Sequence, residues 1–143
     1  MNIRPANLSD TPFIHEMVNA MYSELNYGIS FNESWVTGRL KSRLFMSFVC
    51  ENENGAAGFC TIKITKDEYG QAGNMAFLYE LYVKPESRKS GNAAKLLAYV
   101  ERELKELEIN YIELYVHINN SGGYDFWKAQ GFFDKYHVLG KKL

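Results

Sequence analysis

The sequence lacks the features that mark metal-binding and membrane proteins. It has two cysteines and three scattered histidines, with no Cys-x-x-Cys pair, so no metal site is expected. No stretch reaches the roughly 20 apolar residues of a membrane-spanning helix, and the opening MNIRPANLSD has no apolar signal-peptide core. We therefore expect a cytoplasmic protein that does not have a membrane as a partner.

An excess of charge of one sign is also lacking. The 16 Lys and Arg side chains nearly balance the 17 Asp and Glu side chains, and the formal net charge is −1. Bulk electrostatics therefore gives no reason to expect nucleic acid as a partner.

Aromatic residues are abundant instead, with ten Tyr, nine Phe and two Trp. They favour β-strands, and they suit either an ordinary aromatic core or a ligand cleft with aromatic walls. The length of 143 residues is enough for one sizeable core, so we expect a single domain over residues 1–143.

Hydrophobic periodicity and turn signals predict the order βα(α)βββαβαβ, which is a mixed α/β (α+β) fold. The Asn54-Gly55 pair predicts a hairpin. Cys50 and Cys60 would lie on the two strands of this hairpin. The sequence is compatible with a disulfide between them, but it favours two buried thiols. The predicted strands cover residues 1–5, 46–51, 57–65, 75–83, 111–116 and 132–143. The predicted helices cover about 10–24, 33–44, 93–108 and 124–129. A polar loop is predicted at 66–74.

The turn between the 75–83 strand and the next helix carries the strongest candidate site. The amphipathic helix that starts near Ala93 has first N–H groups without intrahelical partners, at the positive end of its dipole. Gly91 leaves room for an anion there, and Arg88 and Lys89 add positive charge, so the turn suits a pyrophosphate. The alternative is that Gly91 only gives flexibility at the start of the helix and that the cations are solvated.

The pattern Arg88-x-x-Gly91-x-Ala93 resembles the Q/R-x-x-G-x-G/A signature of the GNAT superfamily of acyl-CoA-dependent N-acyltransferases. Other segments are similar to that family in the same order: MNIRPANLSD, ENENGAAGF, LYELYVKPESRKSGNAAKLL, NNSGGYDFWKAQGFF and HVLGKKL. The resemblance covers nearly the whole chain. It implies the GNAT fold, a mixed central sheet of about six to seven strands that splays between the fourth and fifth and is flanked by about four helices.

The resemblance implies acetyl-CoA as the acyl donor and no metal. The donor would lie between the splayed strands, with its pantetheine arm beside the backbone of Leu81, Tyr82 and Val83. Asn120 and Trp127 match family positions beside the cofactor arm, although a helix cap is the alternative for Asn120. The residues that would wrap the pyrophosphate, mostly through N–H groups, are Arg88, Lys89, Ser90, Gly91, Asn92 and Ala93.

The resemblance also implies a general base at Glu80. An amine with an ordinary pKa of about 10 must lose a proton before it attacks a thioester. Strand alternation predicts Glu80 on one face with Leu78 and Tyr82, opposite Tyr79 and its neighbours. A carboxylate in mid-sheet is costly unless it has a partner or a function. The alternative is a solvated or salt-bridged Glu80.

The general acid is where this sequence departs from the family. Trp127 stands four residues before the Gly-Phe pair, where a tyrosine is usual, and an indole cannot transfer a proton. Tyr124 lies about one helical turn earlier and is the candidate acid, with a packing role as the alternative. His117 is a further candidate for base or substrate contact. A thiolate can also leave with the help of water.

The resemblance places the acceptor pocket in MYSELNYGISFNESW, with Tyr22, Tyr27 and Trp35 as candidate contacts. Aromatic rings suit a cationic amine, although ordinary surface and core would look similar. The predicted activity is direct transfer of an acetyl group from acetyl-CoA to a primary amine of a small molecule, in a chain that the family allows to be a homodimer. The alternatives are an acyl-CoA-binding or sensing module without catalysis, suggested by Trp127, and an acetyltransferase acting on a protein or peptide amine.

Overall fold

The computed structural model describes residues 1–66 and 73–143. The predicted polar loop at 66–74 falls mostly on residues that lie outside the described ones. None of the helices in the described part of the chain is both long and apolar enough to cross a membrane. The strands are β1 (Asn2–Pro5), β2 (Phe45–Asn52), β3 (Gly55–Lys66), β4 (Asn74–Val83) and β5 (Ile112–Glu113). The helices are α1 (Thr11–Glu24), α2 (Glu33–Lys41), α3 (Asn92–Glu106) and α4 (Ser121–Ala129), with 3-10 turns at Leu8–Asp10 and Pro85–Ser87.

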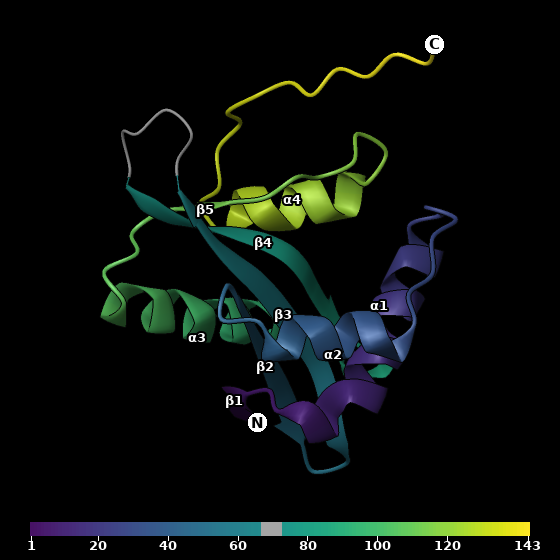
Figure 1. Ribbon diagram of the computed structural model, residues 1–143, viewed down its shortest axis with the longest axis vertical. Coiled ribbons are helices and arrows are strands. Elements are labelled where there is room, and N and C mark those ends of the chain that lie inside the picture. The colour runs from purple at the N-terminus through teal and green to yellow at the C-terminus, as the bar shows by residue number, and fades with distance from the viewer. Residues whose placement is uncertain (67–72) are drawn as a thin grey trace.

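The described strands form one mixed sheet in the order β1-β2-β3-β4-β5 (Figure 1). The first four strands pair antiparallel, whereas β4 and β5 are parallel. The predicted hairpin is confirmed, because Asn52 pairs with Gly55, whose φ of +102° suits a glycine in a tight turn. The mixed α/β fold predicted from the sequence is therefore confirmed.

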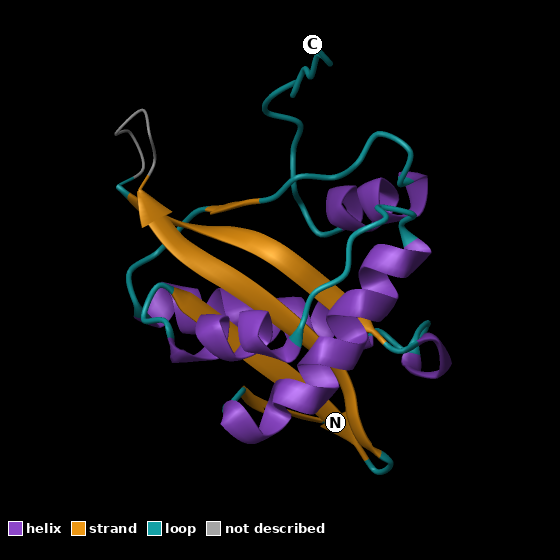
Figure 2. Cartoon of the chain, turned by 45° about the vertical axis from the view of Figure 1, so that its right-hand side comes forward, coloured by secondary structure: helices purple, strands orange, loops and turns teal. Residues whose placement is uncertain are grey.

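Helices cover both faces of this sheet (Figures 1 and 2). The apolar side of α3, including Leu96 and Val100, packs with Phe48 on one face. Val18 of α1 and Val36 of α2 belong to a second buried cluster on the other face. The middle strands are therefore buried from both sides, and their polar side chains must find partners inside the protein.

The helix starts follow the capping signals in the sequence. Asn7 and Asp10 form a capping box at the first 3-10 turn, and Pro12 lies in the first turn of α1. The Asn32 side chain accepts a hydrogen bond from the Trp35 N–H at the start of α2. Cys50 and Cys60 are buried free thiols, which is the state the sequence favours.

The C-terminal part of the sheet is smaller than predicted. The 111–116 strand is reduced to Ile112–Glu113, and residues 132–143 form no strand, so the described residues hold five strands. A strand needs a neighbour to complete its hydrogen bonds. β5 parts from β4 after Glu113, and the last residues run out from the body (Figure 1). Helix α4 begins at Ser121 rather than Tyr124 because Asn120 caps it.

Candidate active site

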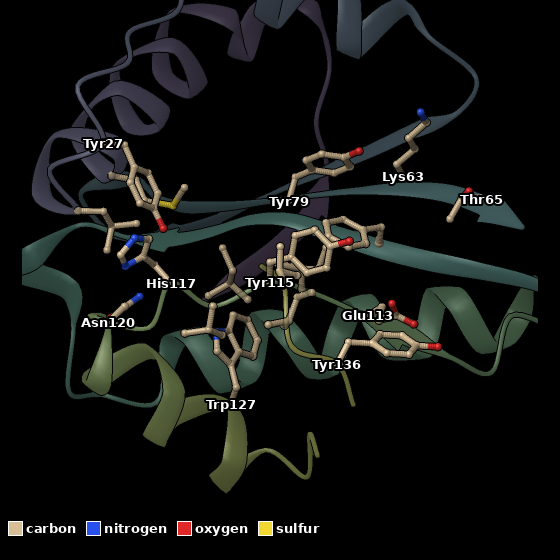
Figure 3. Close-up of a pocket in the computed structure, with 18 of the residues that line it drawn as sticks. Tyr27, Lys63, Thr65, Tyr79, Glu113, Tyr115, His117, Asn120, Trp127 and Tyr136 are labelled. Carbon is tan, nitrogen blue, oxygen red and sulfur yellow. The ribbon is translucent and has the colours of Figure 1, made fainter. Parts of the chain in front are cut away.

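The main cavity lies where β4 and β5 separate. The two strands pair only at Ala76 with Ile112 and at Phe77 with Glu113. Beyond these pairs they diverge, and a cavity of about 780 Å³ opens between them. Side chains from several elements line it, and Figure 3 shows Tyr27, Tyr79, Tyr115, His117 and Trp127 among them. Tyr22 lines it as well. The predicted splay between the fourth and fifth strands is thus confirmed.

A β-bulge in β4 sets which side chains reach each face of the sheet. Thr61 pairs with Glu80 and Ile62 pairs with Leu78, so Tyr79 is an extra residue opposite β3. Leu78 therefore joins the cluster beneath α3, whereas Glu80 faces α1 and α2. The prediction that Leu78 and Glu80 share a face is wrong, because the bulge reverses the alternation between them.

Glu80 is held in a buried ion pair. Its carboxylate is 1% exposed, and one guanidinium nitrogen of Arg39, Nη1, donates to both oxygens at 2.9 and 3.0 Å. The Tyr22 hydroxyl donates to the same carboxylate at 3.5 Å. Burial raises the pKa of Glu80, while Arg39 acts in the opposite direction. The sequence left open whether Glu80 is a general base, a solvated side chain or a salt-bridged one. The geometry shows a salt-bridged Glu80, and its role as a base stays a prediction.

Arg39 is fixed by aromatic rings as well as by Glu80. Its guanidinium lies 4.2 Å from the Trp35 ring centroid, 4.7 Å from that of Phe45 and 4.9 Å from that of Tyr79. Sequence reasoning missed this residue. The available signal was that Arg39 is a cation one turn after Trp35 on a helix whose Val36 faces the core.

Two of the three predicted acceptor residues line the cavity. The Tyr22 ring packs 5.4 Å from that of Tyr27, and the Tyr27 ring lies 5.6 Å from His117. Burial raises the pKa of Tyr22 to about 12, so its hydroxyl stays protonated at neutral pH. Trp35 does not line this cavity, because its ring stacks on Phe31 at 3.9 Å.

The predicted pyrophosphate-binding turn has a left-handed backbone. Lys89 has a φ of +64° and Gly91, the N-cap of α3, has a φ of +75°. A Cβ added at Gly91 would meet no atom within 4 Å, so the space over the start of the helix is open. No side chain caps α3, while Asn92 and Ser90 instead bond to the Ser87 carbonyl oxygen at 2.9 and 3.1 Å. The turn thus offers backbone N–H groups to an anion, and a pyrophosphate fits it.

Arg88 does not contribute a free charge to this turn. Its Nε donates to the Val83 carbonyl at 2.8 Å, and its Nη2 donates to both Glu24 oxygens at 3.0 Å. Glu24 also accepts from the Tyr82 hydroxyl at 2.6 Å. The expectation that Arg88 adds positive charge at the rim is therefore wrong in this structure. Arg88 ties the turn to the end of β4 and to α1.

The residues predicted on α4 are divided between the cavity and the surface. Asn120 lines the cavity and also caps α4, since its side chain accepts from the Gly123 N–H at 3.0 Å. Trp127 lines the cavity and packs on Phe132. Tyr124 does not line it, because its hydroxyl donates to the Asp134 carboxylate at 2.9 Å.

Neither a metal nor a cysteine nucleophile is indicated by these residues. No group of three His, Cys, Asp or Glu side chains that could hold a metal ion occurs in residues 1–66 and 73–143. Burial raises the pKa of both the Cys50 and the Cys60 thiols, which makes them poor nucleophiles.

Comparison with known proteins connects this geometry to a family. The model of the acetyltransferase (GNAT) family matches residues 12–132. Among curated proteins, the spermidine N(1)-acetyltransferase of Thermoplasma acidophilum is 28% identical, over 92% of this chain and 88% of that protein.

Solved acetyltransferase structures share the fold. A predicted acetyltransferase from Clostridium acetobutylicum, solved with acetyl-CoA, has a TM-score of 0.76 at 21% identity, over 99% of this chain and 95% of that one. An aminoglycoside acetyltransferase from an uncultured soil metagenomic sample has a TM-score of 0.80 at 17% identity, over 99% of this chain and 94% of that one.

Proposed function

Because the chain belongs to the acetyltransferase (GNAT) family and is an acyl-CoA-dependent N-acetyltransferase, we propose that it moves an acetyl group from acetyl-CoA directly to a primary amine of a small molecule. The observation that carries this proposal is the cavity between the diverging β4 and β5. Beyond Phe77, no described strand pairs with the edge of β4 that faces β5, and the cavity runs beside this unpaired edge. Aromatic rings form its walls. One space can therefore take a thioester arm and an amine together.

The donor side rests on backbone groups. Leu81 lines the cavity, and Tyr82 and Val83 continue the same strand toward the turn Arg88–Ala93. The open space at Gly91 and the uncapped first N–H groups of α3 support binding of the pyrophosphate there. Asn120 and Trp127 would lie against the pantetheine arm of acetyl-CoA, on the side of the cavity formed by α4.

Proton removal from the amine is assigned to Glu80 acting through Tyr22. Tyr22 lines the cavity and its hydroxyl already donates to Glu80. As the amine attacks the thioester carbonyl, it passes a proton to the Tyr22 oxygen, and the Tyr22 proton moves to Glu80. Tyr22 thus ends the step unchanged, and Glu80 holds the proton.

The other two parts of the reaction, charge on the thioester carbonyl oxygen and departure of the thiolate, do not require a catalytic side chain. Negative charge on the carbonyl oxygen can be met by an N–H of β4 on the edge facing β5. A thiol has an ordinary pKa of about 8.5, so its thiolate can leave without an acid. Tyr124 is not given the acid role here, because Asp134 holds its hydroxyl.

The acceptor side suits a compact cation. The curated relative named above acetylates spermidine, which is a polycation, and the aromatic lining here supports an ammonium group. However, the lining also contains Lys63 and Lys66, and its Glu113 is paired with Lys135 at 3.0 Å. An acceptor with one ammonium group and no further cations near Lys63 fits this lining better than a long polyamine.

Calorimetric titration with acetyl-CoA, followed by thiol release across a panel of amines, tests this function. The panel contains monoamines, amino acids, spermidine and peptides with a free N-terminus or a lysine. We expect binding and release that depends on a small amine, above the hydrolysis seen without amine. Release only with peptides would move the acceptor to proteins, and binding without any release would indicate a sensing module.

A further inference from the structure

One end of the cavity carries lysine side chains that have no acidic partner among residues 1–66 and 73–143. Lys63 and Lys66 both line the cavity, and neither takes part in any of the ion pairs found there. The Nζ atom of Lys63 lies 5.6 Å from the Phe45 ring centroid, which is a weak contact for a half-buried cation. An ammonium group has three donors, so Lys63 can still bind an anion.

The acidic side chains that the structure describes at this cavity are already paired. Glu113 lines the cavity and bonds to Lys135 at 3.0 Å. Glu80, which lies behind the wall, bonds to Arg39 at 2.9 Å. The described part of the site therefore has an excess of positive charge at Lys63. A negative group on the acceptor would be attracted to that end, and a positive one would be repelled.

The strand register places Lys63 on the same face of the sheet as Glu80. Thr61 pairs with Glu80, and Lys63 lies two residues further along β3. Side chains return to the same face at every second residue, and the intervening Ile62 belongs to the cluster beneath α3. Two residues of a strand span about 7 Å, so a compact molecule can reach from the proton-accepting side to Lys63. Thr65 comes next on that face and also lines the cavity, where its hydroxyl can add a hydrogen bond.

Three aromatic rings, of Phe77, Tyr79 and Tyr115, form an aromatic floor beside Lys63. Phe77 pairs with Lys63 across the strands, and its ring centroid lies 5.0 Å from that of Tyr79 and 4.9 Å from that of Tyr115. Tyr79 and Tyr115 are 41% and 70% exposed. In the view of Figure 3, Tyr79 lies between Lys63 and Tyr27. Neighbouring exposed rings of this kind offer an apolar surface that a side chain of the acceptor can cover.

We propose that the acceptor is an amino acid with an apolar side chain. Its carboxylate binds Lys63 and Thr65, its amino group faces Tyr22, and its side chain lies on the aromatic floor. One ammonium group and one hydroxyl match the two oxygens of a carboxylate, whereas a phosphate has three. This inference rests on the proposed function and names its substrate class. A C–N bond forms at the amino nitrogen as the thioester C–S bond breaks, the proton passes to Glu80 as above, and the carboxylate is unchanged.

Thiol release with matched pairs of amines tests this inference. Each pair holds an amino acid and the amine without its carboxylate: phenylalanine with phenethylamine, and leucine with 3-methylbutylamine. In the wild type we expect kcat/KM to be at least about tenfold higher for the amino acid, the scale of one hydrogen-bonded charge. Alanine should be a poorer acceptor than phenylalanine, because it leaves the aromatic floor uncovered.

Variants of Lys63 show whether this side chain causes the preference. In Lys63→Met the ratio of kcat/KM for amino acid and amine should fall by about tenfold, and in Lys63→Arg most of it should be kept. The matched control is Lys105→Met, at an exposed position on α3 outside the cavity lining, which should keep the wild-type ratio. Both amines of a pair are measured on the same preparation, so partial loss of folded protein does not change the ratio.

The possible results separate this inference from the proposed function. Equal kcat/KM for amino acids and their decarboxylated amines would keep the transferase and overturn the amino-acid acceptor. A preference that survives in Lys63→Met would also overturn it, because the carboxylate would then bind elsewhere. Alanine equal to phenylalanine would overturn the role of the aromatic floor. Binding of acetyl-CoA without release from any amine would overturn the proposed function itself, and this inference with it.

Discussion

Arg39 and Glu80 form the one buried ion pair between helix and sheet that the described residues show, with both carboxylate oxygens accepting from a single guanidinium nitrogen. The pair lies behind Tyr22, whose ring lines the cavity. It therefore links the stability of the α2 layer to the electrostatics of the candidate active site.

Breaking this pair from either side should destabilise the protein. Arg39→Met leaves the Glu80 carboxylate buried without its cation, and the free energy of unfolding is expected to fall by about 3–5 kcal/mol. The double variant Arg39→Met/Glu80→Gln removes both charges and should recover most of this loss. Urea denaturation of the single and double variants measures both effects. Single variants within about 1 kcal/mol of the wild type would show that the pair is not desolvated.

Tyr22→Phe tests the proton relay. The substitution keeps the ring and removes the hydroxyl that joins the cavity to Glu80. We expect kcat to fall by about 10²-fold, the scale of general base catalysis, with the Kd for acetyl-CoA unchanged. Tyr27→Phe is the matched control, because Tyr27 also lines the cavity but has no hydrogen bond to Glu80 among the described residues. Equal rates in the two variants would remove Tyr22 from the mechanism.

Gly91→Asn tests the pyrophosphate-binding turn. Asn tolerates the positive φ of this position better than other side chains, and it would project into the open space over α3. The Kd for acetyl-CoA should rise at least tenfold, about 1.4 kcal/mol. Gly28→Asn is the control, since Gly28 has a φ of +64° and equally open surroundings. Unchanged affinity in a folded Gly91→Asn protein would mean that the phosphates bind elsewhere.

Tyr124→Phe tests whether an acid is needed. The Tyr124 hydroxyl bonds to Asp134 and is absent from the cavity lining, so kcat should stay within about twofold of the wild type. Steady-state rates at saturating acetyl-CoA give the comparison. A fall of a hundredfold would restore Tyr124 as the group that protonates the leaving thiolate.

Acid should weaken the protein through Asp10. Arg4 donates to both Asp10 oxygens at 2.8 Å and holds the pKa of Asp10 below its ordinary value of 3.8. The folded state therefore binds this proton less readily than the unfolded state. Its stabilising contribution is present above the unfolded pKa and is lost as pH falls toward the folded one.

Denaturation curves at pH values from about 7 to about 3 measure this dependence. The loss of stability in acid should be less steep in Asp10→Asn than in the wild type. Asp125→Asn, at an exposed position on α4, serves as the control and should follow the wild type. Parallel acid profiles in the wild type and Asp10→Asn would contradict the assignment.

Much of the fold was predictable because its signals are local. The Asn54-Gly55 hairpin, the caps at Asn7 and Asn32 and the face of α3 each depend on a few neighbouring residues. The splay and the turn at Gly91 followed from the family resemblance, whose motif is itself short.

The contacts that decide the site were not predictable, because they join distant parts of the chain. Arg39 and Glu80 are 41 residues apart, and Arg88 and Glu24 are 64 apart, so no sequence pattern pairs them. The bulge at Tyr79 adds a residue that strand alternation cannot anticipate. Residues 132–143 form no strand, because a strand needs a neighbour to pair with, and the sequence of this segment does not state whether one lies within reach.

The most direct test of the account is the initial-velocity pattern with acetyl-CoA and an active amine varied together. In the proposed function the cavity takes donor and acceptor side by side, and the buried Cys50 and Cys60 thiols offer no covalent carrier. The account predicts double-reciprocal lines that intersect, as direct transfer within a ternary complex requires. Parallel lines, together with an acetylated enzyme seen by mass spectrometry when the amine is left out, would contradict it.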